Sequence, residues 1–251
     1  MTRHGPLNEF CWMDLKTHDL SGTAAFFSSV MGWEFAVDEQ DWRRAVKFSA
    51  GGHRIGGISD LAQPVYPPGT PAHIAYYLAV DDVDLRTAVA AENGAQVVVP
   101  PFDAGDQGRI ATLADPMGAV FSLWRPSGIA GWPASPPPEG EDVGVGVDVP
   151  RIEAAPHRMV LVSEDPRRAQ DFYTEMLGAP LARATFQQGP YGATSAPQWE
   201  LLIGVYDVEA VVTRACEREC GLVTLSRECG RPRAQLRSPE GLTFRIQPLG
   251  L

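Results

Sequence analysis

The feature that most constrains the fold is a pattern of one strand, one helix and three strands that recurs along the chain. Its first copy opens with an alternating strand over 7–17, after which Asp19 begins a helix that Gly32 ends. Asp is a preferred helix N-cap and Gly a preferred C-cap, so these two residues set the helix bounds. Three further strands are expected over 33–38, 44–50 and 53–59. The segment is a βαβββ module.

The same module returns three times. Asp82, Asp165 and Asp207 begin the later helices in the same way. The second module has expected strands over 73–80, 96–99, 109–114 and 119–125, the third opens with 157–163, and the fourth runs from Trp199 to a closing strand over 242–247. The turn Asp115-Pro-Met-Gly118 also returns as Ser238-Pro-Glu-Gly241. Together these repeats predict an α+β fold of tandem βαβββ modules.

The third module is short. In the first module 43 residues separate Gly32 from Ala75, whereas only 22 separate Gly178 from the matching Glu200. The missing length is that of a strand hairpin. We therefore expect one wall of the C-terminal sheet to be incomplete, or to be rebuilt by the loop at 189–198.

The 251 residues suit two domains of ordinary size. We expect an N-terminal domain over 7–125, built from two modules, and a C-terminal domain over 157–251, built from the shortened third module and the fourth. Residues 126–156 are rich in proline and glycine and are expected to be a linker.

The balance of charge excludes some classes of partner. A formal net charge of −10 repels the phosphates of nucleic acids and of anionic membrane surfaces. No apolar run is long enough to span a bilayer, and residues 1–10 show no signal-peptide core, so a cytoplasmic location is expected. The expected partner is a small molecule, bound by a monomer or a homodimer.

Strand alternation separates two faces in the N-terminal domain. Cys11, Met13 and Leu15 are all apolar, and they should lie under a helix. The opposite face mixes aromatic and polar residues: Phe10, Trp12, Asp14, His73, Tyr77, Ser122 and Trp124. Such a mixture on a concave surface is typical of a small-molecule pocket, although a second apolar layer with a few polar groups is the alternative.

Within this expected pocket, Asp14 is the candidate general acid or base. His73 is expected to be its partner or a donor to a substrate oxygen. Trp12, Tyr77 and Trp124 are expected to stack on the substrate, with Phe10 and Ser122 beside them. Arg109 is expected either to hold an anionic group or to form a salt bridge at the rim.

The C-terminal domain carries its own polar cluster on the face opposite the apolar one. Arg158, Glu200 and Arg245 are expected to gather there. One interpretation is a structural ion-pair network, and the other is a site for an anion or carboxylate.

Several segments carry a family resemblance. They are Phe10-Cys-Trp-Met-Asp-Leu-Lys-Thr-His-Asp19, Ala25-Phe-Phe, Gly32-Trp33, the stretch from Gly108 to Trp124, and Ala169-Gln-Asp-Phe-Tyr173 with Leu177-Gly178. The chain resembles two-domain, glyoxalase-like and bleomycin-resistance-like proteins of the vicinal oxygen chelate superfamily, of an actinobacterial type. The resemblance implies two glyoxalase-like domains and a place in secondary metabolism. It does not select one chemistry, since such folds serve metal-dependent lyases, isomerases, dioxygenases and metal-free drug-binding proteins.

The same resemblance places metal ligands of the family at four points of the N-terminal domain. Here those points fall on Trp12, Gly57, Ala75 and Ser122, none of which suits a divalent metal. In the C-terminal domain they fall on Arg158, Glu200 and Arg245, where two cations oppose a metal. No metal cofactor is therefore expected. The alternative is a shifted metal site made of Asp14, His53 and His73.

These residues lead to one preferred function and two alternatives. The preferred one is a metal-independent enzyme that acts on a small hydrophobic or aromatic metabolite by acid and base chemistry, of the isomerase, cyclase or lyase type. The first alternative is a non-catalytic drug- or metabolite-binding protein that confers resistance. The second is a metal-dependent lyase or dioxygenase that uses the shifted site.

Overall fold

The structure is a computed structural model, and it describes residues 7–39, 41, 44–127, 131–132, 152–189, 197–228 and 230–249. Its four α-helices within these residues are α1 (Leu20–Met31), α2 (Val83–Glu92), α3 (Pro166–Leu177) and α4 (Val208–Cys216). Each begins after an aspartate, at Asp19, Asp82, Asp165 and Asp207, whose side chain accepts a backbone N–H of the first turn. The predicted N-caps are therefore confirmed, and Gly32 and Gly178 end α1 and α3 in the left-handed region that favours glycine.

The strands form two sheets. The first has eight strands in the order β2 (Glu34–Val37), β3 (Val46–Ala50), β4 (His53–Asp60), β1 (Phe10–Thr17), β5 (His73–Ala79), β8 (Val120–Pro126), β7 (Gly108–Ala114) and β6 (Gln96–Asp103). The second has six, in the order β10 (Ala184–Gln188), β9 (Pro156–Ser163), β11 (Trp199–Val205), β14 (Thr243–Pro248), β13 (Arg231–Arg237) and β12 (Gly221–Glu228). A 3₁₀ turn, η1 (Gly105–Gln107), precedes β7. The mixed α+β class is confirmed.

The shortened third module is visible in this order. After α1 the chain makes β2, β3 and β4, whereas between α3 and β11 the described residues form the single strand β10. β10 pairs in parallel with β9, with Thr185 opposite Val160. The expected rebuilding of this wall by the loop at 189–198 concerns residues 190–196, which lie outside the described residues. Most of the expected linker, at 128–130 and 133–151, lies outside them as well.

Backbone contacts divide the chain into two compact units that do not follow the order of the sequence. Unit 1 consists of Met1–Met13, Ala75–Gly131 and Arg158–Glu200, and unit 2 of Asp14–Ile74, Trp132–His157 and Leu201–Leu251. Each unit therefore takes one module from each half of the chain. The predicted domain boundaries at 125 and 157 separate pairs of modules along the sequence. Whether the two predicted domains fold independently stays a prediction.

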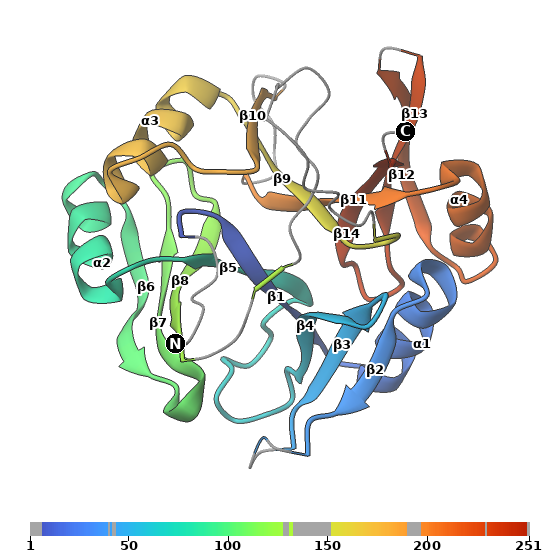
Figure 1. Ribbon diagram of the computed structural model, residues 1–251, viewed down its shortest axis with the longest axis horizontal. Coiled ribbons are helices and arrows are strands. Elements are labelled where there is room, and N and C mark those ends of the chain that lie inside the picture. Colours follow the sequence, from blue (N-terminus) through green and yellow to red (C-terminus); the bar gives the residue numbers. More distant parts are fainter. Residues whose placement is uncertain are drawn as a thin grey trace, which may run out of the picture. The chain divides into compact units, whose positions relative to one another are not determined.

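In unit 1, α2 packs on β6, β7 and β8 and against α3 (Figure 1). Between the helices and the strands lies a fully buried aromatic group in which Phe121, Phe172 and Trp199 surround Tyr173. The Tyr173 hydroxyl donates to Oδ2 of Asp115 at 3.0 Å and accepts from Nε1 of Trp199 at 2.8 Å. A buried tyrosine needs such partners, so this network belongs to the core.

In unit 2, α1 packs against α4, and α4 covers β12, β13 and β14 (Figure 1). Phe27 of α1 stacks on Trp33, with ring centroids 4.8 Å apart, and also contacts Phe244 of β14. All three rings are buried, as the apolar spacing of α1 requires. No helix within the described residues has both the length and the apolarity that crossing a membrane requires.

The two repeated turns close with the same device. In the first, Oδ1 of Asp115 accepts the backbone N–H of Met117 and of Ala119, both at 2.9 Å. In the second, Oγ of Ser238 accepts the backbone N–H of Leu242 at 3.1 Å. Gly118 and Gly241 have φ angles of 98° and 92°, which residues other than glycine rarely adopt. The repeated sequence pattern thus reflects one repeated turn geometry.

Candidate active site

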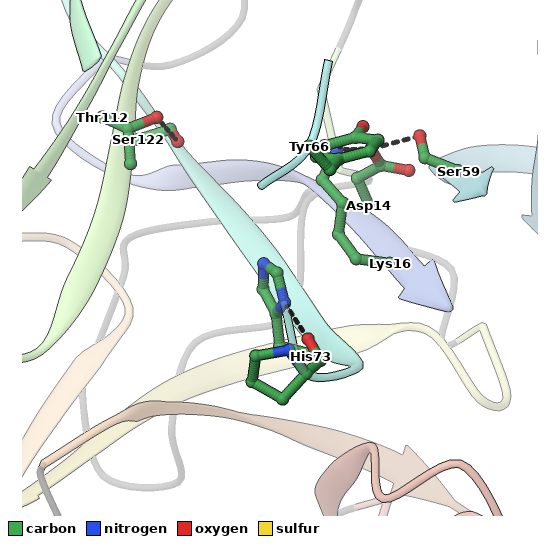
Figure 2. Close-up of polar contacts among 8 residues, drawn as sticks. Asp14, Lys16, Ser59, Tyr66, His73, Thr112 and Ser122 are labelled. Atoms are coloured by element: carbon green, nitrogen blue, oxygen red, sulfur yellow. Dashed lines mark hydrogen bonds and ion pairs between the residues drawn. The ribbon is translucent and has the colours of Figure 1, made fainter. Parts of the chain in front are cut away.

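Asp14 lies in β1 and carries a largely buried carboxylate. Its side chain is only 12% exposed. Oδ2 accepts one hydrogen bond from Nζ of Lys16 at 2.5 Å and one from Oγ of Ser59 at 2.7 Å (Figure 2). Asp14 and Lys16 are two positions apart on one strand, which places both side chains on the same face. Ser59 reaches them from β4. The charge of Lys16 compensates the buried charge of Asp14.

The other oxygen of Asp14 has a different environment. Both hydrogen bonds that the structure gives this side chain within the described residues end on Oδ2. Gly57 of β4 lies beside Oδ1, since a Cβ atom built on this glycine would stand 3.4 Å from Oδ1. A side chain at position 57 would contact Oδ1, and glycine supplies no side chain there. Asp14 is therefore held by one oxygen and can present the other to a ligand.

Tyr66 completes the polar group. Its hydroxyl oxygen accepts a hydrogen bond from Nζ of Lys16 at 2.8 Å, and the same Nζ lies 4.8 Å from the centre of its ring. Figure 2 shows Tyr66, Lys16, Asp14 and Ser59 converging on one point. Lys16 thus bridges a carboxylate and a phenol. Hereafter the carboxylate network means these four residues.

His73, expected to be the partner of Asp14, has other contacts. It lies at the start of β5, it is exposed, and its Nδ1 is 2.8 Å from the backbone oxygen of Pro71 (Figure 2). A carbonyl oxygen only accepts, so Nδ1 carries a proton in this contact. The charged partner that the structure gives Asp14 is Lys16 instead.

The expected aromatic residues of unit 1 form a packed cluster. The rings of Trp12 and Trp124 meet edge to face with centroids 6.1 Å apart, and Tyr77 meets Trp124 in the same manner at 5.8 Å. Both tryptophans are buried, whereas Tyr77 and Ile110 are only partly buried. The Nε1 of Trp124 donates to the backbone oxygen of Gln107 at 2.8 Å. The exposed surface of this cluster therefore comes mainly from Tyr77 and Ile110.

Ser122 lies in register with Tyr77 on the neighbouring strand, and it pairs with Thr112 on the other side. The two hydroxyl oxygens are 2.9 Å apart (Figure 2). Strand register thus adds a pair of hydroxyls beside Tyr77. Thr112 was not among the residues expected from the sequence.

Two other expected residues have different surroundings. Phe10 contacts Tyr76 and Trp199, with ring centroids 6.4 and 4.9 Å away, so its ring packs among buried aromatic side chains. Arg109 makes two parallel hydrogen bonds to Asp84, one of them from Nη2 at 2.7 Å, and a third to Asp103 at 3.0 Å. The hydrogen bonds from Asp84 and Asp103 raise the pKa of this guanidinium. Of the two roles expected for Arg109, the structure shows the salt bridge at the surface.

The expected cluster of the second sheet is distributed over β9, β11 and β14. Arg158 donates to Oγ1 of Thr185 at 3.3 Å, and the buried Glu200 accepts from the side chain of Gln198 at 3.3 Å. Arg245 stands opposite Gln235 in the pairing of β14 with β13. Whether these three residues work together stays a prediction.

The residues at the expected ligand points do not fit a divalent metal. The indole of Trp12 packs on Trp124, the hydroxyl of Ser122 is bonded to Thr112, and Gly57 and Ala75 have no donor atom in their side chains. In the part of the chain that the structure describes, no three His, Cys, Asp or Glu side chains are grouped to hold a metal. Asp14, His53 and His73 are within that part. The chemistry that the carboxylate network itself offers is proton transfer.

Three members of the carboxylate network were missed by reasoning from the sequence. Lys16 shares a strand face with Asp14, and this spacing was a usable signal. Ser59 and Tyr66 lie 45 and 50 residues from their partners, and only the pairing of the strands and the path of the loop before β5 bring them there. Neither has a local sequence signature.

Comparison with known proteins adds a family to this geometry. The model of the family described as "Glyoxalase/Bleomycin resistance protein/Dioxygenase superfamily" matches residues 11–123. The chain is 28% identical over 281 aligned positions to "Anthracycline biosynthesis protein DnrV" of Streptomyces peucetius, covering 99% of this chain and 96% of that protein. It is 35% identical over 116 residues to "Putative glyoxylase CFP32" of Mycobacterium bovis, covering 45% of this chain and 44% of that one.

Solved structures share the fold at lower sequence identity. The Mn(II)-bound glyoxalase from Novosphingobium aromaticivorans superimposes with a TM-score of 0.61 and 16% identity, over 97% of this chain and 83% of that one. Identity at this level supports the arrangement of the modules alone.

Proposed function

Because residues 11–123 belong to the Glyoxalase/Bleomycin resistance protein/Dioxygenase superfamily, we propose that this protein is a biosynthetic enzyme that moves a proton on a small hydrophobic or aromatic molecule. Asp14 is the general acid and base. Isomerisation, cyclisation and elimination all include such a step. The proposal includes no metal cofactor.

The observation that carries the proposal is the geometry of Asp14. A carboxylate that is 12% exposed is costly to bury unless it is compensated, and Lys16 and Ser59 compensate it through Oδ2. Oδ1 stands beside a glycine and is left to meet a proton of the substrate. A purely structural carboxylate would be expected to use both oxygens, as Asp115 does.

The class of substrate is proposed from a relative that aligns with 99% of this chain. Its name places it in anthracycline biosynthesis, and anthracyclines are polycyclic aromatic compounds. Substrate stacking on Trp12, Tyr77 and Trp124 stays a prediction, because both tryptophans are buried and the exposed surface of their cluster comes mainly from Tyr77 and Ile110. His73, whose Nδ1 is engaged by Pro71, is assigned the relay of the proton through Nε2.

Anthrone is a suitable probe, because it is a planar tricyclic ketone with an acidic methylene group. We expect the protein to accelerate exchange of the methylene protons in D₂O, followed by NMR, and to bind anthrone with quenching of tryptophan fluorescence. In Asp14→Asn, exchange should fall by about 10²- to 10⁴-fold, the usual contribution of general acid or base catalysis, while binding persists. Exchange that is unchanged in Asp14→Asn would remove Asp14 from this role.

A non-catalytic binding protein is the second candidate, and the packed cluster of Trp12, Tyr77 and Trp124 is the observation in its favour. Binding of anthrone without any acceleration of exchange, and loss of binding in Tyr77→Ala but not in Asp14→Asn, would favour it. The proposal that the protein works without a metal is tested by measuring the metal content of protein purified without chelator or affinity-tag histidines. Close to one equivalent of iron, manganese or zinc that is lost in Asp14→Ala would make Asp14 a ligand.

A further inference from the structure

The loop between β4 and β5 places a phenol next to the proposed base. Its turns are closed by three backbone hydrogen bonds: from Gln63 to Asp60 at 3.2 Å, from Tyr66 to Gln63 at 3.1 Å, and from Thr70 to Pro67 at 3.2 Å. Pro64, Pro67 and Pro68 restrict its backbone further. Tyr66 is therefore held in place before any ligand arrives.

Lys16 determines which part of the Tyr66 hydroxyl is available. Its Nζ donates to the phenol oxygen at 2.8 Å, so that oxygen acts as the acceptor toward Lys16. The hydroxyl proton must then point away from Lys16. A hydrogen bond from a cation to the oxygen also polarises the O–H group and makes it a stronger donor.

From this arrangement we infer that Tyr66 is a second catalytic residue of the proposed site, and that the substrate is an enolisable ketone whose oxygen accepts a hydrogen bond from the Tyr66 hydroxyl. Lys16 is the positioning residue that holds both Asp14 and Tyr66. The inference rests on the proposed function of Asp14, and it adds the substrate's functional group and the residue that recognises it.

The step balances without any other reactant. Asp14 takes the proton from the carbon next to the carbonyl group, or from a carbon conjugated with that group through an aromatic ring, as the methylene of anthrone is. The electron pair of that C–H bond becomes a new carbon–carbon double bond conjugated with the carbonyl carbon. The π pair of the carbonyl moves to its oxygen, which becomes an enolate held by the Tyr66 O–H. Return of the proton from Asp14 to the same or a conjugated carbon restores the ketone. Neither an oxidant nor a reductant is required.

The variant Tyr66→Phe removes the hydroxyl and keeps the ring, so it separates the contributions of the two groups. The phenyl ring keeps its contact with Lys16, while the donor to the substrate and the acceptor for Nζ of Lys16 are both removed. We expect the rate constant for anthrone exchange at saturation to fall by about 10²- to 10³-fold, as for loss of one oxyanion donor, with little change in the dissociation constant. Tyr206→Phe, at a tyrosine of the same unit that is 65% exposed, is the matched control and should exchange at the rate of the unaltered protein.

A second measurement does not depend on turnover. The asparagine of Asp14→Asn is neutral, as Asp14 is after it has taken the substrate's proton. The ionised form of 1-naphthol serves as a planar analogue of the enolate. We expect 1-naphthol bound to Asp14→Asn to ionise at a lower pH than in water, followed by its absorbance. Adding Tyr66→Phe should return this ionisation toward the value in water.

The two measurements distinguish the inference from the proposal on which it rests. Exchange that requires Asp14 but is unaffected by Tyr66→Phe overturns the inference and leaves the proposed function intact. Absence of exchange in the unaltered protein, together with a Tyr66-dependent shift of 1-naphthol, contradicts catalysis and retains Tyr66 as the oxyanion donor. Failure of 1-naphthol to bind, or a shift that persists without the Tyr66 hydroxyl, overturns the inference.

Discussion

Two buried aspartates, one in each compact unit, show how the same side chain serves different ends. Asp115 uses both oxygens: Oδ1 accepts two backbone N–H groups of its turn and Oδ2 accepts the Tyr173 hydroxyl. Asp14 uses one oxygen, for Lys16 and Ser59, and turns the other toward a glycine. The lesson is that burial alone does not mark a functional carboxylate. An oxygen that is left for a ligand is the more informative sign.

The comparison predicts that Asp115 matters more for stability than Asp14. Asp115→Ala leaves two backbone N–H groups and the Tyr173 hydroxyl without their acceptor inside the core, so the free energy of unfolding should fall by about 3 kcal/mol. Asp14→Asn keeps an acceptor for Lys16 and Ser59 and should lose about 1 kcal/mol. Urea unfolding followed by circular dichroism gives both values. Equal losses would show that Asp14 is as structural as Asp115.

Lys16→Met tests the charge balance of the carboxylate network. It leaves Asp14 largely buried without its cation, which should cost about 2 kcal/mol in the free energy of unfolding. The double variant Lys16→Met/Asp14→Leu removes both charges and should recover part of that loss. If the double variant is less stable than Lys16→Met, desolvation of Asp14 is not the source of the cost.

Gly57→Val tests whether an open Oδ1 is what distinguishes Asp14. The new side chain would meet Oδ1 at its Cβ, so exchange of anthrone should fall by about tenfold. Gly57 is buried, so thermal unfolding is measured alongside to show that the variant stays folded. Full activity in Gly57→Val would mean that Oδ1 does not meet the substrate.

The smallest expected effect is the pH dependence contributed by Asp115. Burial raises the pKa of Asp115, and its hydrogen bonds oppose this rise. A carboxyl with a raised pKa in the folded state contributes stability that is complete below its unfolded pKa of about 4 and is lost as pH rises through the folded value. Tyr173 stays protonated there, because burial raises its pKa as well.

The free energy of unfolding of Asp115→Asn minus that of the unaltered protein should therefore increase as pH rises from about 4, and then level off. Denaturant titrations at a series of pH values measure this difference. If this difference decreases over the same pH range, the pKa of Asp115 is lowered on folding, and a positive charge near Asp115 stabilises its ionised form.

The local signals in the sequence were sufficient for much of the fold. Aspartate caps located the starts of four helices, glycines ended two of them, and the short spacing after Gly178 indicated the reduced third module. Strand β6 extends to Asp103, past the expected end at residue 99 and through two prolines, which alternation alone does not predict. The division into compact units was also not visible, because it depends on packing between helices far apart in the chain.

The site was predicted less completely than the fold. Alternation identified Asp14 and the cluster of Trp12, Tyr77 and Trp124, since these follow from one strand and its register. The charged partner that the structure gives Asp14 is Lys16, whereas Nδ1 of His73 lies 2.8 Å from the backbone oxygen of Pro71, so the role expected for His73 stays a prediction. Tyr66 was out of reach, as its position depends on the turns of a loop 50 residues away from Lys16.

The most direct test of the central claim is chemical rescue of the base. Asp14→Gly removes the carboxylate and leaves space for a small one, so it should bind anthrone but exchange its methylene protons slowly. Added formate should restore exchange in proportion to its occupancy of that space, and chloride at the same ionic strength should not. Exchange in Asp14→Gly that equals that of the unaltered protein, or that formate does not increase, would contradict the assignment of Asp14 as the catalytic base.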